Sequence, residues 1–519
     1  MPRNHDPNLP RPSKLTPALP IAQRGGVWLT LLLVLLVLVA GGLAVIAYGL
    51  QQEVERQRST AADERRRGED LAAFILTGFA DQLTPLGRIE LLETPARKVL
   101  DYYASLPADA ATSDTALRAR SVALDLLGEA LARRGDLPRS LDAYREALAL
   151  AEELAARQPE DEERQRDLAV SLTKIGDAKE ARGELAAARD AYGKALAIFE
   201  RQAKARPEDR QVRHDQALMH ERLGRVLSAQ SDFPGALKAF RLRQITLLQL
   251  TNEAPDQLNW QRELGHSYGA LGDLFLTQGD RPAANAAYQR YQEIAQQVVR
   301  REPDNAEWQR DLAVSFEKAG DLRAVQGDIG GARAAYQKFS EIASRLSAQD
   351  PGNLQWQRDV AAGQERVAAL LAAQNKLGEA VVLQQRGADR LAVIAGKLGL
   401  PAARSEAAEA YGRLSRYLLL HRQPKEAVDA AQRGLAIDGN QTRLRLNLAH
   451  ALLYSGRVAE AEQVYRQNRH AVLPGEKRFD EEALAELRDL IVKGLVPPEM
   501  APVETWLKGG GGARKPAAD

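Results

Sequence analysis

Histidine, cysteine and carboxylate side chains are the groups of this chain that could bind a metal ion or act as a nucleophile. The chain has no cysteine, which removes thiolate ligands, thiol nucleophiles and disulfides. Of its seven histidines, His214 and His220 are six residues apart and fall on different faces of a helix, and the others are scattered. Zinc needs three or four convergent ligands, and no HExxH sequence supplies them. We therefore expect no metal site and no cofactor.

Motifs of catalysis and of nucleotide binding are also missing. The chain has no GxxxxGK[ST] or GxSxG sequence, and the glycines of 509–512 do not lie in a loop that opens a helix. Carboxylates are too numerous to nominate an acid–base pair. The 71 Lys and Arg residues nearly balance the 70 Asp and Glu residues, so no overall field attracts nucleic acid. We expect a binding protein and not an enzyme, with no nucleic-acid partner.

The most conspicuous polar motif is WQRD or WQRE, which recurs at a constant 48-residue interval at Trp260, Trp308 and Trp356. Its place near the first turn of a helix predicts a structural role. We expect the indole to pack against the preceding repeat unit. We expect Arg310 and Asp311 to form helix-terminal or inter-repeat ion pairs, each worth about 0 to 1 kcal/mol where exposed.

The motif belongs to a unit that is repeated with the same 48-residue period. Each unit has a proline, a small residue, a second small residue 12 positions after the first, and an aromatic residue four positions later. This spacing predicts two antiparallel helices joined by a tight turn, with small residues that let the backbones approach and an aromatic ring in the seam. The prolines are Pro159, Pro207, Pro255, Pro303 and Pro351; the first small residues are Gly128, Gly176, Gly224, Gly272, Gly320 and Ala368; the second are Ser140, Ala188, Ala236, Ala284, Ala332 and Ala380; the aromatics are Tyr144, Tyr192, Phe240, Tyr288 and Tyr336; the turn glycines are Gly135, Gly183, Gly279 and Gly327.

This arrangement of glycine, alanine and aromatic residues resembles the tetratricopeptide repeat, which is normally about 34 residues long. The extra 14 residues are about four helical turns, so about two additional turns in each helix keep the arms matched. Two further units follow: the step from Ala380 to Ala427 falls just short of the long period, and the step from Ala427 to Ala461 has the ordinary length, with Tyr465 beside it. The resemblance implies an all-α fold, an α-solenoid of about eight stacked hairpins over residues 115–470.

The segments outside the array have different compositions. Val27–Leu50 holds 24 residues without a charge, enough to cross a bilayer of about 30 Å, whereas a cleaved signal peptide usually has only about 7 to 15 apolar residues. The expected order is a disordered Pro-rich tail (1–26), one transmembrane helix (27–50), a charged helical stalk (51–70), bridging helices split near Pro85 and Gly87 (71–114), the array (115–470), capping helices (471–507) and a disordered tail (508–519).

The long unit with its WQRDLAVS sequence resembles the extended arrays of bacterial signalling proteins. Residues 74–107 resemble the segment that precedes such arrays after the membrane helix of receptor-type Ser/Thr kinases, but only 26 residues precede the apolar span here, so we expect no kinase domain. The resemblance implies a single-pass protein of the bacterial inner membrane with its repeats in the periplasm. Lys and Arg residues on the two flanks nearly balance and do not decide the orientation.

The first helix of each pair lines the inner face in this family, so the resemblance places partner binding there. Candidate residues lie one position after the repeat glycine and three before it: Thr173, Asp177, Glu221, Arg225, Asp273, Glu317 and Asp321. Their acidic bias predicts a groove for a basic or mixed peptide; a merely solvated helix face is the alternative. The leading hypothesis is a membrane-anchored scaffold that binds proteins or peptides. A receptor-like signalling subunit that senses an envelope ligand is the second. The sequence does not specify the partner, the pathway or the oligomeric state.

Overall fold

The computed structural model describes residues 58–83, 89–473, 477–497 and 501–508. The expected tails, the apolar span Val27–Leu50, the first residues of the expected stalk and the expected break near Pro85 and Gly87 lie outside these ranges. Within them, no helix is both long enough and apolar enough to cross a membrane. The chain divides into two compact units, Met1–Gln82 and Leu83–Asp519.

The described part of the first unit is helical. The α-helix α2 (Arg58–Phe74) continues through one π-helical segment, η1 (Ile75–Phe79), into α3 (Ala80–Leu83). No helix end falls at residue 70, where the expected stalk meets the expected bridging region. The charged residues 58–70 and the apolar residues after them therefore belong to one continuous helical run.

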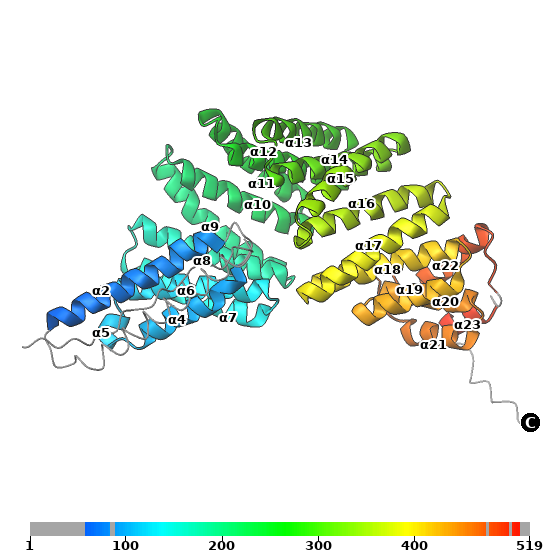
Figure 1. Cartoon of the computed structure of the whole chain (residues 1–519), viewed down its shortest axis with the longest axis horizontal. Helices are drawn as coiled ribbons and strands as arrows, with labels where there is room; N and C mark the ends of the chain where they lie inside the picture. Colours follow the sequence, from blue (N-terminus) through cyan, green and yellow to red (C-terminus); the bar gives the residue numbers. More distant parts are fainter. Residues whose placement is uncertain (1–57, 84–88, 474–476, 498–500, 509–519) are drawn as a thin grey trace, which may run out of the picture. The chain divides into compact units, whose positions relative to one another are not determined.

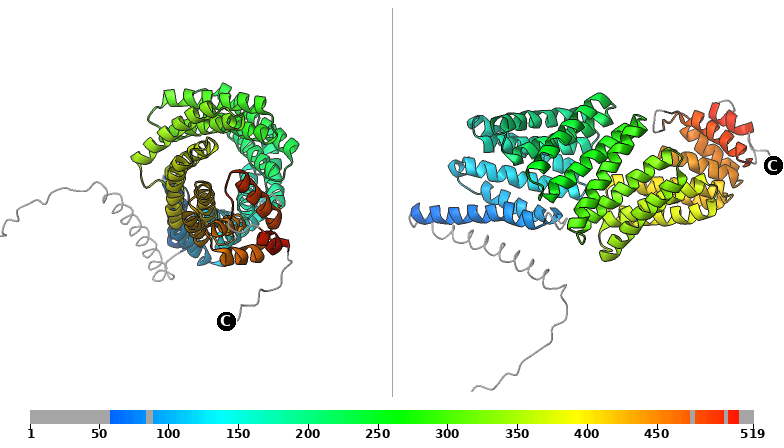
Figure 2. Two further views of the ribbon diagram at one scale, coloured as in Figure 1. Left: turned by 90° about the vertical axis from the view of Figure 1, so that its right-hand side faces the viewer. Right: turned by 90° about the horizontal axis from the view of Figure 1, so that it is seen from above.

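The second unit contains eight consecutive helical hairpins, as the repeat analysis predicted (Figure 1). Both views of Figure 2 show neighbouring pairs lying side by side. The second helix of each pair packs against the first helix of the next pair. The pairs are α6 (Asp114–Arg133) with α7 (Leu137–Arg157), α8 (Glu162–Ala181) with α9 (Leu185–Ala205), α10 (Arg210–Ala229) with α11 (Phe233–Glu253), α12 (Leu258–Thr277) with α13 (Arg281–Arg301), α14 (Ala306–Val325) with α15 (Ile329–Gln349), α16 (Leu354–Ala373) with α17 (Leu377–Leu398), α18 (Pro401–Leu420) with α19 (Pro424–Ile437), and α20 (Thr442–Tyr454) with α21 (Val458–Asn468).

Helix lengths explain the 48-residue period. In the second pair, α8 has 20 residues and α9 has 21, whereas α20 and α21 of the last pair have 13 and 11. The first helix of the long pair is thus longer by about two turns. The seventh pair is intermediate, with a long α18 of 20 residues and a short α19 of 14. The second helix of the long pair, α9, is longer than α21 by ten residues, nearly three turns, so both arms are lengthened as predicted, the second by more than the expected two turns.

The turn inside each hairpin needs a left-handed residue. Gly135, Gly183, Gly279 and Gly327 have φ between 76° and 82°, as glycine allows. Ser231 and Asn375 occupy the same position in their own units with φ of 62° and 61°. Sequence reasoning missed these two turns because it searched for glycine.

The helices of each hairpin meet through the predicted glycine and aromatic ring. A Cβ atom placed on Gly128, Gly176, Gly224, Gly272 or Gly320 would lie 2.4 to 2.6 Å from the aromatic ring on the second helix of the same hairpin. The rings are almost fully buried; Tyr192, for example, is 0% exposed. Glycine is therefore required there because the ring occupies the space of a side chain.

Short helices cover both ends of the array. At the N-terminal end, η2 (Ile89–Leu92), α4 (Glu93–Ala104) and α5 (Ala108–Ala111) contact α6. At the C-terminal end, α22 (Phe479–Val492) and α23 (Ala501–Lys508) pack on the last pair, and the ring of Trp506 stacks on that of Tyr465 at 6.3 Å between centroids.

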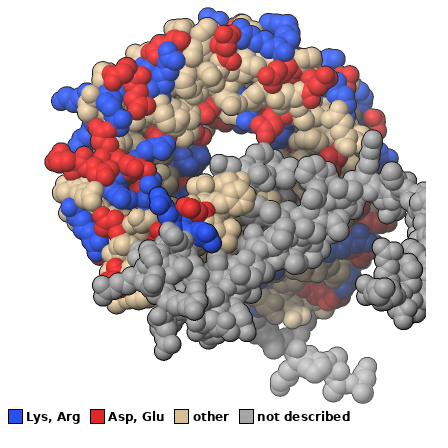
Figure 3. All heavy atoms as spheres, turned by 60° about the vertical axis from the view of Figure 1, so that its left-hand side comes forward, with Lys and Arg blue, Asp and Glu red and all other residues tan. Residues whose placement is uncertain are grey.

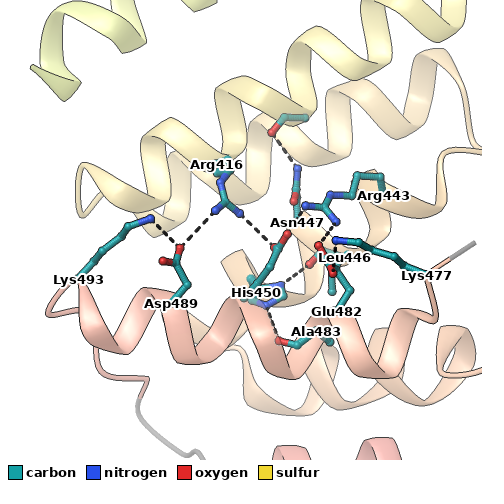
Figure 4. A network of polar contacts seen from close by, with 12 residues as sticks. Arg416, Arg443, Leu446, Asn447, His450, Lys477, Glu482, Ala483, Asp489 and Lys493 are labelled. Atoms are coloured by element: carbon teal, nitrogen blue, oxygen red, sulfur yellow. Dashed lines mark hydrogen bonds and ion pairs between the residues drawn. The ribbon is translucent and has the colours of Figure 1, made fainter. Parts of the chain in front are cut away.

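Polar contacts also hold α22 in place (Figure 4). Arg416 of α18 pairs with Glu486 at 3.2 Å, and Arg443 of α20 pairs with Glu482 at 3.1 Å. Besides its helices, the described part of the chain has one isolated antiparallel bridge, between Val472 and Arg478.

Candidate protein-binding face

The first helices of the pairs form one continuous face, called here the first-helix face. Successive first helices contact each other directly, for example α6 with α8 and α12 with α14. Two sets of polar contacts link these helices, one near their N-terminal ends and one near their C-terminal ends. A side chain on this face therefore interacts with the first helix of the next unit as well as with its own hairpin.

The first set is the proximal ladder. In each rung a basic side chain pairs with a carboxylate 49 residues later, on the next first helix, at 2.5 to 2.9 Å. The rungs are Arg118–Asp167, Arg166–Asp215, His214–Glu263, Arg262–Asp311 and Arg310–Asp359. Arg310 and Asp311 thus both make inter-repeat ion pairs, as the WQRD motif predicted.

The second set is the distal ladder. In each of its rungs, one unit supplies the carboxylate and the next unit supplies the cation. The rungs are Glu129–Lys174, Asp177–Arg222, Asp273–Lys318 and Asp321–Arg366, at 2.7 to 2.8 Å. In three of them the seam tyrosine of the same hairpin also donates its hydroxyl: Tyr192 to Asp177, Tyr288 to Asp273 and Tyr336 to Asp321. Burial, followed by these carboxylates, raises the pKa of each hydroxyl, so each remains a donor.

The seven residues predicted to bind a partner lie in or beside the distal ladder. Asp177, Asp273 and Asp321 are rungs of it. Glu317 pairs with Arg366 at 3.3 Å, and Arg225 pairs with Glu180 at 2.9 Å.

Two of the seven predicted residues contact buried parts of the array. Glu221 lies 3.0 Å from Arg243, which is 2% exposed and whose pKa is lowered by burial. Thr173 is 8% exposed, and its hydroxyl donates to the carbonyl of Ala169 at 2.7 Å. All seven therefore contribute to packing within or between units, and their binding role stays a prediction.

The acidic bias of these seven residues is offset by their partners. The set contains five carboxylates and one guanidinium; its partners Arg222, Arg243, Lys318 and Arg366 add four cations and Glu180 adds one carboxylate, so six negative charges face five positive ones. Side chains of both signs are interspersed on the face that Figure 3 shows. Net charge alone therefore does not select a basic peptide.

An aliphatic stripe runs between the two ladders. On α8, Arg166, Val170 and Lys174 follow one another at four-residue steps, so a proximal cation, an apolar side chain and a distal cation share one face of the helix. Most members of the stripe are half-buried, and Val170 is 38% exposed. The stripe consists of Val122, Val170, Leu218, His266, Val314 and Ala362. Sequence reasoning missed it, although its 48-residue spacing was available as a signal.

The stripe deepens into a hollow of about 180 Å³ between α8, α9 and α10. Its apolar lining is Val170, Phe199, Leu218 and Met219. Its polar lining is Arg166, Thr173, Lys174, Asp177, Asp215 and Arg222, which includes two of the predicted residues and two ladder rungs.

A second and much smaller space, of about 10 Å³, lies between α12, α13 and α14 and is lined in part by Tyr291.

Trp308 has the structural role predicted for it. It is 6% exposed and lines the small space above together with Tyr291, Ile294 and Val298 of the preceding unit. Its indole N–H donates to Glu302 at 2.7 Å, and the guanidinium of Arg262 lies 5.2 Å from its ring centroid, a cation–π contact.

Among the residues that the structure describes, no group of three or more His, Asp and Glu side chains is placed to hold a metal ion. The face offers paired charges and an apolar stripe, which are suited to contact with another polypeptide.

The comparisons with known proteins agree with this architecture. The family model described as tetratricopeptide repeat matches residues 121–159, which lie in the first hairpin, α6 with α7. The match covers this one hairpin, and the other pairs repeat its helix–turn–helix arrangement in an all-helical array. No curated protein matches the chain.

Several solved structures resemble the chain. The apo form of the quorum sensor NprR from B. thuringiensis is 12% identical, with 77% of this chain and 97% of that chain covered and a TM-score of 0.47. The apo form of RapI is 12% identical, with 82% and 99% covered and a TM-score of 0.47. A tetratricopeptide repeat protein from Parabacteroides merdae ATCC 43184 is 12% identical, with 64% and 98% covered and a TM-score of 0.34. The likeness concerns the fold alone.

Proposed function

We propose that the chain is a scaffold that binds a protein or peptide partner on its first-helix face. The observation that carries the proposal is the hollow at Val170 and Leu218. Its volume of about 180 Å³ suits one large side chain, because pockets for whole small molecules are roughly 300 to 1,000 Å³. An apolar anchor in a hollow surrounded by polar groups is the usual arrangement of an interface hot spot.

The ladders indicate how such a partner gains affinity. Their charges are already paired within the array, so a partner that competes for them must first break existing ion pairs. The favourable term that remains is burial of apolar surface on the stripe, about 25 cal/mol for each Å². We therefore expect the partner to present an apolar side chain flanked by residues of both charge signs.

The membrane part of the proposal rests on the sequence of Val27–Leu50, which is long and apolar enough to cross a bilayer. We propose that this segment anchors the chain in the bacterial inner membrane with the array in the periplasm. An anchor raises the effective concentration of the array near other membrane proteins without new contacts. A reporter fused after Asp519 that is active only outside the cytoplasm tests this topology; an inactive reporter on a full-length, stable fusion contradicts it.

Photo-crosslinking in the full-length chain tests the binding face. A photoreactive amino acid is placed at Val170 or at Leu218, and a control is placed at Ile245 of α11, which is 51% exposed on a second helix. We expect a discrete crosslinked protein from the first two positions and none from the control. Equal crosslinking at all three positions, or crosslinking at Ile245 alone, contradicts the proposal.

The substitution Leu218→Gln tests the hollow. Leu218 is half-buried and supplies part of the apolar lining, so a polar amide there removes the apolar contact without adding a charge. We expect the variant to keep its helical circular dichroism and to lose crosslinking from Val170. Undiminished crosslinking in a folded variant would show that the hollow does not hold the partner.

A further inference from the structure

Two histidines occupy positions that other units fill with residues that do not titrate near neutral pH. His214 stands in the proximal ladder, where the equivalent residues are Arg118, Arg166, Arg262, Arg310 and Arg358. His266 stands in the aliphatic stripe, where the equivalent residues are Val122, Val170, Leu218, Val314 and Ala362. Both lie in the same part of the array, on α10 and α12. Histidine is the side chain whose charge changes most readily between about pH 5 and 8.

The His214 rung is well formed and partly shielded from water. Its Nε2 atom lies 2.9 Å from both carboxylate oxygens of Glu263 on α12, and the His214 side chain is 14% exposed. The ring of Trp260 on α12 lies 6.4 Å away, Arg243 approaches from α11, and Asp215 is on the same helix. The other proximal rungs join a permanent cation to a carboxylate, whereas this one has full strength only when the imidazole is protonated.

His266 lies one helical turn after Arg262 and reaches the next unit. Its Nε2 atom is 3.1 Å from Asp311 of α14, which also pairs with Arg262. The ring of Tyr291 on α13 packs edge-on against it, and Glu263 lies on the same helix. The His266 side chain is 35% exposed, so a polar ring interrupts the aliphatic stripe next to the His214 rung.

We propose that His214 makes the α10–α12 part of the first-helix face respond to pH. Acid closes the His214–Glu263 rung between α10 and α12. Neutral to alkaline pH loosens the rung and with it the part of the face around Leu218, which lies one helical turn after His214 on α10. The loosening of the rung is independent of any ligand, whereas the effect on a partner rests on the proposed function.

The pKa values of His214 and Glu263 are shifted in the directions expected for an ion pair. Burial lowers the pKa of His214, but the hydrogen bond and charge of Glu263 outweigh it and raise the pKa above 6.5. Burial raises the pKa of Glu263, and His214 outweighs that effect and lowers the pKa below 4.5. The rung therefore stabilises the array most between about pH 4.5 and 6.5, and its contribution is lost as pH rises through the folded pKa of His214.

Amide hydrogen exchange of the full-length chain tests the rung without a ligand. After correction for intrinsic exchange, we expect α10 and α12 to exchange about two- to fivefold faster at about pH 9 than at about pH 5.5. The helices α16 and α18, which the Arg358–Glu406 pair joins at 2.7 Å, should show no such change. His214→Arg, which restores the residue of the other units, should remove the difference. His214→Gln should exchange fast at both pH values. A wild-type chain without the difference, or a His214→Arg chain that keeps it, overturns the proposal.

Crosslinking from Leu218 tests the binding half. We expect its yield to fall as pH rises in the wild-type chain and to be independent of pH in His214→Arg, which keeps the rung closed. A yield that does not change with pH in the wild-type chain contradicts the switch but not the scaffold. Absence of crosslinking at every pH contradicts the proposed scaffold function. The exchange experiment still tests whether the His214–Glu263 rung responds to pH.

Discussion

The ring of Tyr192 lies directly against Gly176, so that a Cβ atom on this glycine would come within 2.4 Å of the ring carbon Cε1. The same contact recurs in four other hairpins. It joins the two helices of a unit, and the Tyr192 hydroxyl then continues to Asp177 and the distal ladder. One side chain, Tyr192, therefore takes part both in the packing within its hairpin and in the polar contacts between units.

We predict that Gly176→Ala destabilises the second hairpin by about 1 to 3 kcal/mol, because the ring must move away from a densely packed seam. Gly193→Ala on α9 is the control, since a Cβ there meets nothing within 4 Å and a helix-interior glycine gains about 0.5 to 1 kcal/mol on replacement by alanine. Amide hydrogen exchange of α8 and α9 measures the change in stability caused by each substitution. Similar effects of the two substitutions would refute the close seam.

We predict that Ser231→Gly stabilises the third hairpin by about 1 kcal/mol, because serine is strained at a φ of 62° and glycine is not. Asn375→Gly should gain less, since asparagine tolerates left-handed backbone better than serine. The thermal unfolding midpoints of the two variants, compared with that of the parent chain, give the order. A loss of stability in Ser231→Gly contradicts the assigned turn.

We predict that Asp311→Asn destabilises the array by about 2 to 4 kcal/mol, because Asp311 is 5% exposed and its loss leaves Arg262 and His266 without their shared carboxylate. Asp167→Asn should cost only about 0 to 1 kcal/mol, because that rung is more exposed. Urea unfolding monitored by circular dichroism compares them. Equal midpoints would show that burial does not set the strength of a rung.

We predict that the C-terminal cap weakens as pH falls below about 6.5. His450 is buried beneath α22, with its ring nitrogens near the carbonyls of Leu446 and Ala483 (Figure 4), and burial lowers its pKa below the ordinary 6.5. At acid pH the unfolded chain binds a proton at His450 that the folded cap does not bind, so the stability of the cap decreases as pH decreases. The His214 rung has the opposite dependence, because its contribution is lost as pH increases.

Hydrogen exchange of α20 and α22 at about pH 7.5 and about pH 5 measures this change in the cap. His450→Gln, which cannot take up the proton, should remove the dependence on pH. The cap prediction is wrong if α22 is protected equally at both values in the wild-type chain.

The hairpins could be predicted from the sequence because they depend on local spacing. A glycine, a small residue and an aromatic ring within one hairpin define the seam, and the regular interval defines the stacking. The Trp308 contact and the Arg310 pair followed from the same register. The membrane segment Val27–Leu50 stays a prediction, because it lies outside the described residues.

The charge of the candidate face could not be read from one unit. Asp177 was assigned to an acidic groove by its position on one helix, but its carboxylate is neutralised by Arg222, which lies 45 residues later on α10, the first helix of the next unit. The same holds for Asp273 and Lys318. The turns at Ser231 and Asn375 were missed for a different reason, since only glycine was searched for and these two residues adopt the same left-handed conformation.

Because every proximal rung takes its cation from one unit and its carboxylate from the next, the array is modular in whole units. If residues 210–257 were excised, Arg166 would meet Glu263 and the rung would re-form between former second neighbours. Evolution or design could thus shorten or extend the array by one whole unit at a time. Its length would change while the ion pairs between units stayed the same.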